Sequence, residues 1–223
     1  IAILCLVDMW LVNKRYLYDD MFVEQTVRNA PQRMTETDKL ILRDKSLDYR
    51  VLNLASNTFN ENETSYYHKS IGGYSAAKLR RYQEMIDTYI ANEKNKVWNS
   101  VAEAGGDMTK VKGDSLFPVL NMLNTKNFIM PLQAGQTVPV QNLYAYGNAW
   151  FVDRVNYVNN ANEEIAGVGK YNLRHEAVAD AKFKEQLGQS VPQDDTSIVR
   201  LTQYKPNNLV YEVNSNKGGV VVF

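Results

Sequence analysis

Residues 75–98 read SAAKLRRYQEMIDTYIANEKNKVW and give the clearest helical pattern in the chain. The apolar and aromatic side chains that recur there at intervals of three and four residues are Leu79, Tyr82, Ile86, Tyr89 and Ile90. That spacing places them on one face of an α-helix. Ser75 is suited to cap the helix N-terminus, and Arg80 and Glu84 predict an ion pair on the other side. We therefore expect one long helix over residues 75–98.

Shorter segments around this helix indicate both helices and strands. Thr35 and Asp38 have the spacing of a capping box at the start of a short helix. Later helices are expected over residues 117–123, 161–165 and 174–187, and strands over residues 49–54, 127–130, 148–158, 196–204 and 208–214. The chain is therefore predicted to be an α+β protein. A helical and mixed N-terminal part precedes an antiparallel β unit that starts near Asp195, resembles the start of a β-sandwich and is truncated at the C-terminus.

The composition excludes several classes of protein. The chain has 25 basic and 25 acidic residues, so no net charge favours nucleic acid as a partner. It has only two histidines and one cysteine, which are too few for a zinc site of the Cys/His type. Cys5 has no partner for a disulfide within the chain. We expect no metal and no cofactor.

Both ends of the sequence are apolar. The run IAILCLV over residues 1–7 is followed by Trp10, Lys14, Arg15 and Tyr16, whereas residues 219–223 read GVVVF. The first pattern fits the end of a membrane helix, where aromatic and basic side chains lie at the interface. A buried helix of a soluble domain fits it equally well. We divide the chain into residues 1–17, an α+β domain over 18–194, and a β unit over 195–223.

The segment of residues 57–74 is dense in amides, hydroxyls and aromatic rings. Such side chains are suited to bind a sugar, and the candidate ligand-binding residues are Asn60, Asn62, Tyr66, Tyr67, His68, Lys69 and Tyr74. Glu61 or Glu63 with His68 would alternatively form an acid/base pair. A third interpretation, which we favour two to one, is a long ordered loop whose polar side chains satisfy its own backbone.

A second aromatic segment, residues 144–150, reads YAYGNAW. Tyr146, Asn148 and Trp150 are candidates for a carbohydrate platform, although aromatic side chains are more often packed between layers of a fold. No Ser-His-Asp or Cys-His arrangement is recognisable, so no catalytic residue is predicted.

Several ordered segments resemble the YfhO family of bacterial membrane proteins. They are residues 49–54, 59–62, 64–74, 78–82, 120–126, 146–152 and 204–209. The resemblance implies a protein with many membrane helices and a large extracytoplasmic domain, similar to lipid-linked sugar transferases of the GT-C type. It places this chain at the cell membrane, on the extracytoplasmic (periplasmic) side. The catalytic acid of such enzymes lies on a loop between early membrane helices, outside this sequence.

The function that the resemblance implies is therefore an accessory one. The chain is expected to bind or position a glycan or a lipid-linked sugar for glycosylation of cell-envelope polymers, without catalysing a reaction by itself. The parent protein would be the transferase. The alternative is a structural or assembly domain that binds no ligand and packs on its own membrane helices or on a partner protein.

Overall fold

The computed structural model describes residues 2–22, 24–25, 33–187 and 196–223. The chain divides into two compact units, Ile1–Arg33 and Met34–Phe223. Ile1 and the predicted boundary between residues 194 and 195 lie outside the described residues.

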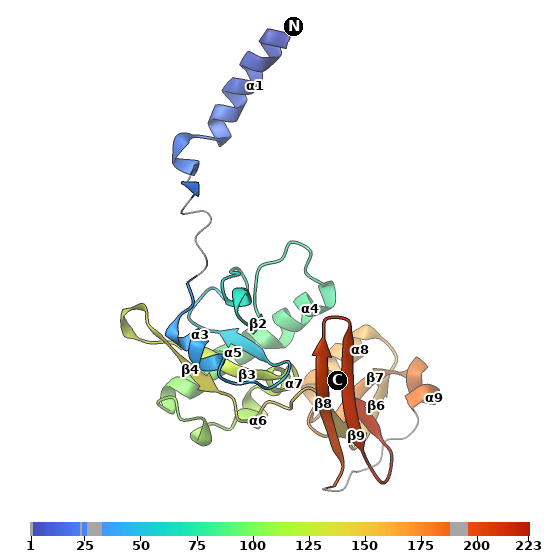
Figure 1. Ribbon diagram of the computed structural model, residues 1–223. Coiled ribbons are helices and arrows are strands. Elements are labelled where there is room, and N and C mark those ends of the chain that lie inside the picture. Colours follow the sequence, from blue (N-terminus) through green and yellow to red (C-terminus); the bar gives the residue numbers. More distant parts are fainter. Residues whose placement is uncertain (1, 23, 26–32, 188–195) are drawn as a thin grey trace. The chain divides into compact units, whose positions relative to one another are not determined.

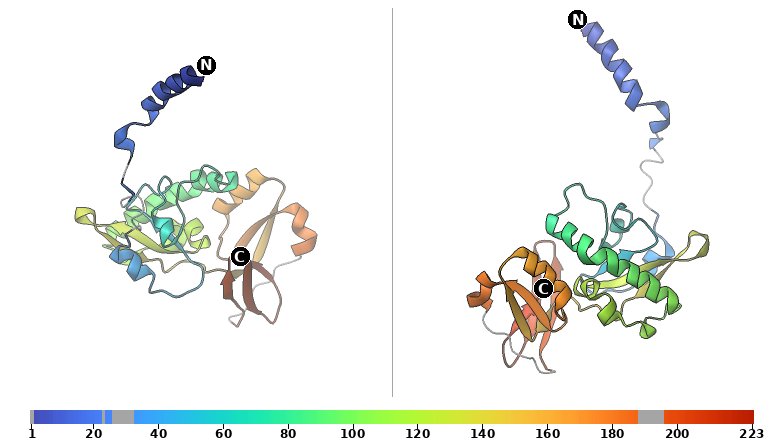
Figure 2. Two further views of the ribbon diagram at one scale, coloured as in Figure 1. Left: turned by 45° about the horizontal axis from the view of Figure 1, so that its top comes forward. Right: turned by 180° about the vertical axis from the view of Figure 1, so that it is seen from behind.

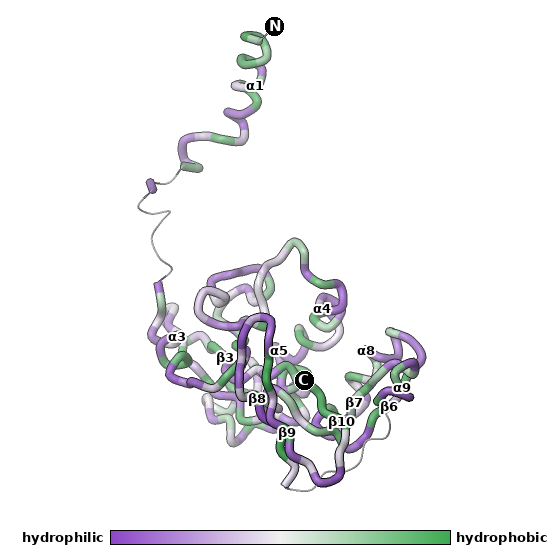
Figure 3. The backbone as a smooth tube through the Cα atoms, turned by 45° about the vertical axis from the view of Figure 1, so that its right-hand side comes forward, coloured by the Kyte–Doolittle hydropathy of each residue, from purple (hydrophilic) through white to green (hydrophobic). Residues whose placement is uncertain are grey.

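The first unit contains helix α1 (Ala2–Tyr16) and the one-turn helix η1 (Asp19–Met21). Every residue of α1 is exposed, and Leu4 and Trp10 are 74% and 64% exposed. Much of α1 is hydrophobic in Figure 3, and Lys14 and Arg15 lie in its last turn. None of the helices in the described ranges has the length and apolar character needed to cross a membrane.

A four-stranded sheet lies at the centre of the second unit (Figure 1). Its strands are β1 (Arg50–Asn53), β2 (Lys69–Ser70), β3 (Thr125–Pro131) and β4 (Thr137–Gln141), in the order β2-β1-β3-β4. β1 pairs in parallel with β2 and with β3, whereas β3 and β4 are antiparallel. The predicted strands over residues 49–54 and 127–130 are confirmed as β1 and β3.

Alternate residues of the central strands point to opposite faces of this sheet. Leu52 and Phe128 belong to the main core, together with residues of the long helix. Val51 and Ile129 pack instead with Ile41 of α3 (Glu36–Ile41). The long helix and α3 therefore cover opposite faces of the sheet, which Figure 2 shows from two further sides.

The long helix consists of α4 (Arg80–Met85), a π-helical turn η3 (Ile86–Ile90) and α5 (Ala91–Glu103). Ile86 and Ile90 are buried as predicted, and Arg80 Nε lies 3.0 Å from Glu84 Oε1. The predicted start was wrong, because Ser75 lies before the helix and Leu79 is its N-cap, without a side-chain cap. Leu79 is 77% exposed, so it does not join the apolar face.

Short elements connect the long helix with the sheet. They are η2 (Thr64–Tyr66), η4 (Met108–Lys110), α6 (Gly113–Leu116), α7 (Pro118–Met122) and η5 (Gln133–Gly135). The helix expected over residues 117–123 is confirmed as α7, which Pro118 opens at a position where a missing N–H costs nothing. The capping box of Thr35 and Asp38 at α3 is also confirmed.

The region after the sheet differs from its prediction in two places. Its elements are β5 (Trp150–Val152), β6 (Arg154–Val158), α8 (Ala161–Lys170), β7 (Glu176–Asp180), η6 (Ala181–Phe183) and α9 (Lys184–Leu187). The single strand expected over residues 148–158 is broken at Asp153. The helix expected over 174–187 was wrong in its first half, because residues 176–180 pair in parallel with β6 and tertiary pairing overrides local helical preference.

The predicted hairpin near the C-terminus is confirmed. β8 (Ile198–Lys205) and β9 (Asn208–Asn214) pair antiparallel, and β10 (Val220–Val222) pairs antiparallel with β5. Helices and antiparallel strand pairs occur together, so the predicted α+β fold class is confirmed.

Candidate functional site

Backbone hydrogen bonds hold the loop of residues 57–74 together. Thr58 O accepts a hydrogen bond from Gly73 N (2.7 Å), and Glu61 O accepts one from Tyr74 N (2.8 Å). A Cβ atom at Gly72 would lie 1.9 Å from Thr58 O. Only glycine therefore permits this close approach of two backbone segments.

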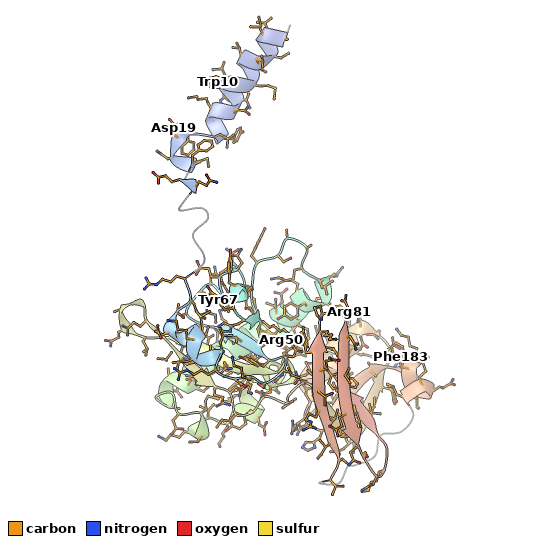
Figure 4. The ribbon with its side chains drawn as sticks, viewed as in Figure 1. Trp10, Asp19, Arg50, Tyr67, Arg81 and Phe183 are labelled. Carbon is orange, nitrogen blue, oxygen red and sulfur yellow. The ribbon has the colours of Figure 1, made fainter. Side chains whose placement is uncertain are left out.

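The candidate side chains on this loop do not line a common cavity. Asn60, Asn62, Tyr66, Lys69 and Tyr74 are exposed, Tyr67 (labelled in Figure 4) is half-buried, and His68 is buried. None of the four cavities described below is lined by a residue of this loop. The loop thus presents its polar side chains separately to solvent.

His68 is a structural link between the loop and α3. Its Nε2 lies 2.9 Å from Asp38 Oδ1, and its side chain is only 1% exposed. Burial raises the pKa of Asp38, but hydrogen bonds from Thr35 and His68 outweigh that effect and leave the pKa below its ordinary value. His68 therefore pairs with Asp38 and not with Glu61, whose Oε2 accepts a hydrogen bond from Thr64 N (3.0 Å).

Lys69 connects the loop to the rest of the unit. Its Nζ forms an ion pair with Asp48 and lies 3.3 Å from the centroid of the Tyr204 ring, on the β8–β9 hairpin. The cation is therefore held between a carboxylate and an aromatic face.

Tyr146 and Trp150 of the second aromatic segment are each 7% exposed. Their ring centroids lie 5.3 Å apart in an edge-to-face arrangement, and Trp150 Nε1 donates to Leu173 O (3.1 Å). Burial raises the pKa of Tyr146 to about 12, an effect that nearby Asp114 strengthens. Both rings are packed side chains with one edge at a cavity, not open stacking platforms.

A buried polar network holds this segment in place, and the sequence analysis did not find it. Asn142 Nδ2 donates to Asn121 Oδ1 (2.9 Å) and to Thr125 O (2.8 Å), and Tyr146 N donates to Asn121 O (3.0 Å). Asn121 is on α7, and the first backbone N–H groups of this helix donate hydrogen bonds to a buried carboxylate.

That carboxylate belongs to Glu93 on α5. Its two oxygens accept hydrogen bonds from Val119 N (3.1 Å) and Leu120 N (2.9 Å). Glu93 is 5% exposed, and this burial raises its pKa to about 7 despite the two backbone donors and nearby Lys96. A carboxylate at the N-terminus of a helix is electrostatically favourable, so Glu93 fixes α7 under the aromatic segment.

Two cavities share Asn124, Gly147 and Asn148. One has a volume of about 310 Å³ and includes Tyr49 and Lys126. The other has a volume of about 420 Å³, and its lining includes Asp48, Arg50, Trp150, Leu209, Tyr211 and Phe223. Figure 4 labels Arg50 beside the hairpin. The larger cavity is lined by both polar and apolar side chains.

The shared wall of these cavities has an unusual backbone. Asp48 and Asn124 have φ angles of 52° and 53°, and Gly147 has a φ angle of 89°. Asp48 O accepts hydrogen bonds from the side-chain amides of Asn124 (2.9 Å) and Asn148. Left-handed non-glycine residues are uncommon and gather at functional sites. The two amides are thereby fixed in orientation at the cavity wall.

A third cavity, of about 560 Å³, also has Trp150 in its lining, together with Tyr146, Asp153, Arg174 and His175, among other residues. His175 Nδ1 lies 2.8 Å from Asp153 Oδ2, and both side chains are partly exposed. A fourth cavity, of about 380 Å³, shares Arg174 and His175 with it.

The structure thus brings together only part of the predicted set. Asn148 and Trp150 line the 420 Å³ cavity, and Lys69 reaches its wall through Asp48. Sequence analysis missed Asp48, Arg50, Asn124 and Arg174, which come from separate segments. The one available signal was that Asp48 and Asn124 are residue types that tolerate left-handed backbone.

Comparison of the chain with protein families, with curated proteins and with solved structures gives no match. Among the described residues, no three His, Cys, Asp or Glu side chains are grouped so that they could hold a metal ion. Fold and site define the chain only as an α+β protein with cavities of ligand size, two of which have Trp150 in their lining.

Proposed function

We propose that the chain is an extracytoplasmic part of a membrane protein similar to the YfhO family, and that it holds a glycan or the sugar part of a lipid-linked sugar. The ligand would lie in the 420 Å³ cavity, and the chain would position it for glycosylation of a cell-envelope polymer without catalysing the reaction.

One observation carries the proposal. The 420 Å³ cavity combines the Asn124 and Asn148 amides, the Asp48 carboxylate and the Arg50 guanidinium with the aromatic side chains of Trp150 and Tyr211. Its volume lies within the usual range for small-ligand sites. Sugars expose many hydroxyl groups beside apolar C–H faces, so they match a wall that offers both fixed polar groups and aromatic surface.

The membrane part of the proposal is supported by α1. Its apolar side chains lie in solvent, where each square ångström of apolar surface costs about 25 cal/mol relative to burial. Trp10 and Lys14, which are in cation–π contact at 5.5 Å, together with Arg15 and Tyr16 are residue types that favour the membrane interface.

Sugar binding is tested with a glycan array, followed by calorimetry with the strongest array ligand. Asn148→Ala is expected to weaken binding about tenfold, since it removes a fixed polar group from the cavity wall. Tyr67→Ala, on the loop that lines none of these cavities, is the control and should bind as the unchanged chain does. Loss of binding in Tyr67→Ala with full binding in Asn148→Ala would contradict this placement.

Membrane association is tested separately by flotation with phosphatidylglycerol and phosphatidylcholine vesicles. Leu6→Asp on α1 should reduce the floated fraction, whereas Leu132→Asp, at an exposed leucine of the second unit, should not. Equal flotation of both variants and the unchanged chain would argue against α1 as the membrane-contacting segment.

A second candidate function, an assembly domain without a ligand, is favoured by the apolar surface of the β8–β9 hairpin. Ile198, Val210 and Val213 are 57%, 41% and 52% exposed. If this surface binds a partner protein or the parent's own membrane helices, Val210→Asp should abolish co-purification with the full-length parent or its partner. An unchanged complex would exclude the hairpin as that contact.

A further inference from the structure

Arg174 occupies the wall between two cavities. It lines both the 560 Å³ cavity, with Tyr146 and Trp150, and the 380 Å³ cavity, with Lys170 and Asp114. Its Cζ lies 5.2 Å from the centroid of the Tyr146 ring. A guanidinium on an aromatic face has its plane fixed while its N–H groups remain directed outward.

The segment that carries Arg174 is held firmly. Asn172 Oδ1 accepts a hydrogen bond from Arg174 N (3.1 Å), and Asn172 O accepts bonds from the backbone N–H groups of His175 and Glu176. Leu173 is 4% exposed and its carbonyl accepts the Trp150 Nε1 hydrogen bond. The backbone that carries Arg174 is therefore held in place before any ligand arrives, which lowers the entropy cost of binding.

Within the part of the chain that the structure describes, the Arg174 guanidinium has no acidic partner. Among residues 33–187 and 196–223 no carboxylate forms an ion pair with it, and its side chain makes one hydrogen bond, from Nη1 to Tyr146 O at 3.4 Å. Asp153, the acid of the 560 Å³ cavity, bonds to His175 instead. A guanidinium has five N–H donors, so most of those of Arg174 form no hydrogen bond with the described residues.

From this geometry we infer that Arg174, with His175 and Lys170, forms a binding site for a phosphate group. The planar fork of arginine matches two oxygens of a phosphate, and a charge-assisted pair of this kind is stronger than a neutral hydrogen bond. His175 lines both cavities and Lys170 lines the 380 Å³ cavity, so both add donors, and Asp114 in the lining of that cavity disfavours a second negative group there. Arg174, His175 and Lys170 do not line the proposed sugar cavity, so the site does not depend on it.

Two soluble ligands distinguish the sources of such a phosphate. Glucose 1-phosphate represents a free sugar phosphate, and dihexanoyl phosphatidylglycerol below its micellar concentration represents a lipid headgroup. Binding of each to the 223-residue chain is measured by calorimetry, with glucose and acetate as ligands that lack phosphate. We expect binding of at least one phosphate compound and no detectable heat with acetate at the same concentration. Heat from glucose in the proposed sugar cavity would be unchanged in Arg174→Gln, whereas heat from the phosphate compound would fall.

Variants place the binding at Arg174. Arg174→Gln should weaken phosphate binding about tenfold or more, since it removes a charged hydrogen-bonding partner, and Arg174→Lys should weaken it less because it keeps the charge. Arg80→Gln removes an arginine from the exposed face of α4 and is the matched control. Lys170→Gln provides a second test if Arg174→Gln unfolds.

The inference is overturned if neither phosphate compound binds, if acetate binds as tightly as they do, or if Arg80→Gln weakens binding as much as Arg174→Gln. Unchanged affinity in both Arg174→Gln and Lys170→Gln also overturns it. Loss of phosphate binding leaves sugar binding at Asn148 unaffected, so failure of this inference is distinguishable from failure of the proposed function.

Discussion

The loop of residues 57–74 and the segment of residues 142–150 contain the same kinds of side chain, yet they serve the fold in opposite ways. The loop closes on its own backbone, since Thr58 O and Glu61 O accept hydrogen bonds from Gly73 N and Tyr74 N. Its His68 and Lys69, although bonded to Asp38 and Asp48, line none of the described cavities. The segment is held by Asn121 of α7 and lines several cavities. Polar and aromatic composition therefore does not identify a site. A site needs side chains that partners elsewhere in the chain hold in place and that still reach a cavity.

The largest expected effect is at Trp150 in the segment. Trp150→Ala should lower the free energy of unfolding by about 3–5 kcal/mol, because it removes a large buried side chain and leaves a void. Urea unfolding measures the change. Tyr66→Ala, at a side chain that is 65% exposed on the loop, is the control and should stay within about 0.5 kcal/mol. An equal decrease in the free energy of unfolding in the two variants would show that the segment contributes no more to stability than the loop does.

The stability of the loop is expected to depend on the hydrogen bonds that close its backbone more than on its side chains. Gly72→Ala should cost about 2–3 kcal/mol, because its Cβ would meet Thr58 O at 1.9 Å and that atom is backbone, which cannot rotate away. Ser75→Ala, three residues further on and exposed, is the matched control. A fully stable Gly72→Ala variant would show that the loop is not closed in this way.

The raised pKa of Glu93, which holds α7 under the segment, should make the stability of the folded chain depend on pH. Its pKa in the folded chain is raised to about 7 from 4.5, so between these values the folded state binds the proton and the unfolded state does not. The contribution is fully present below pH 4.5 and is lost as the pH rises through about 7, with a total of about 3 kcal/mol. Thermal unfolding between pH 5 and 8 should show this decline, and Glu93→Gln should remove it. The same decline in Glu93→Gln would assign it to another group.

A smaller effect is expected where the loop meets α3. Asp38→Ala should cost about 1–2 kcal/mol, because it removes the capping box and leaves buried His68 without its partner. Since the folded-state pKa of Asp38 is lowered, its contribution is present above the ordinary value of 3.8 and is lost as the pH falls through the folded pKa.

The exposed Glu36→Gln is the control for this prediction and should leave urea unfolding near neutral pH unchanged. An Asp38→Ala variant as stable as Glu36→Gln would contradict the structural role given to His68.

Local sequence patterns predicted the elements whose formation depends on near neighbours. The capping box at Thr35, the burial of Ile86 and Ile90, and the β8–β9 hairpin are confirmed. The expected helix over residues 174–187 failed because β7 is stabilised by parallel pairing with β6, a partner about 20 residues away. The N-cap at Ser75 failed because the preceding loop, closed at Gly72, keeps residues 75–79 out of the helix.

The candidate site was less predictable than the fold. Asn148 and Trp150 line a cavity, but Tyr66 and Tyr74 lie on the open surface and His68 is buried against Asp38. Asp48 and Asn124 carried only the weak signal of residue types that tolerate left-handed backbone, and Arg174 carried none, because turn residues and single arginines occur throughout any chain. Their roles come from hydrogen bonds and ring contacts between segments up to 100 residues apart, such as Asn148 to Asp48.

The sequence by itself determined the α+β class, the apolar character of residues 1–17 and the positions of most regular elements, because these depend on spacing and composition over a few neighbouring residues. Only the tertiary structure decided which polar residues face a cavity, that Arg174 has no acidic partner among the described residues, and why burial raises the pKa of Glu93. Those properties depend on burial and on distances between remote segments, and a linear pattern contains neither.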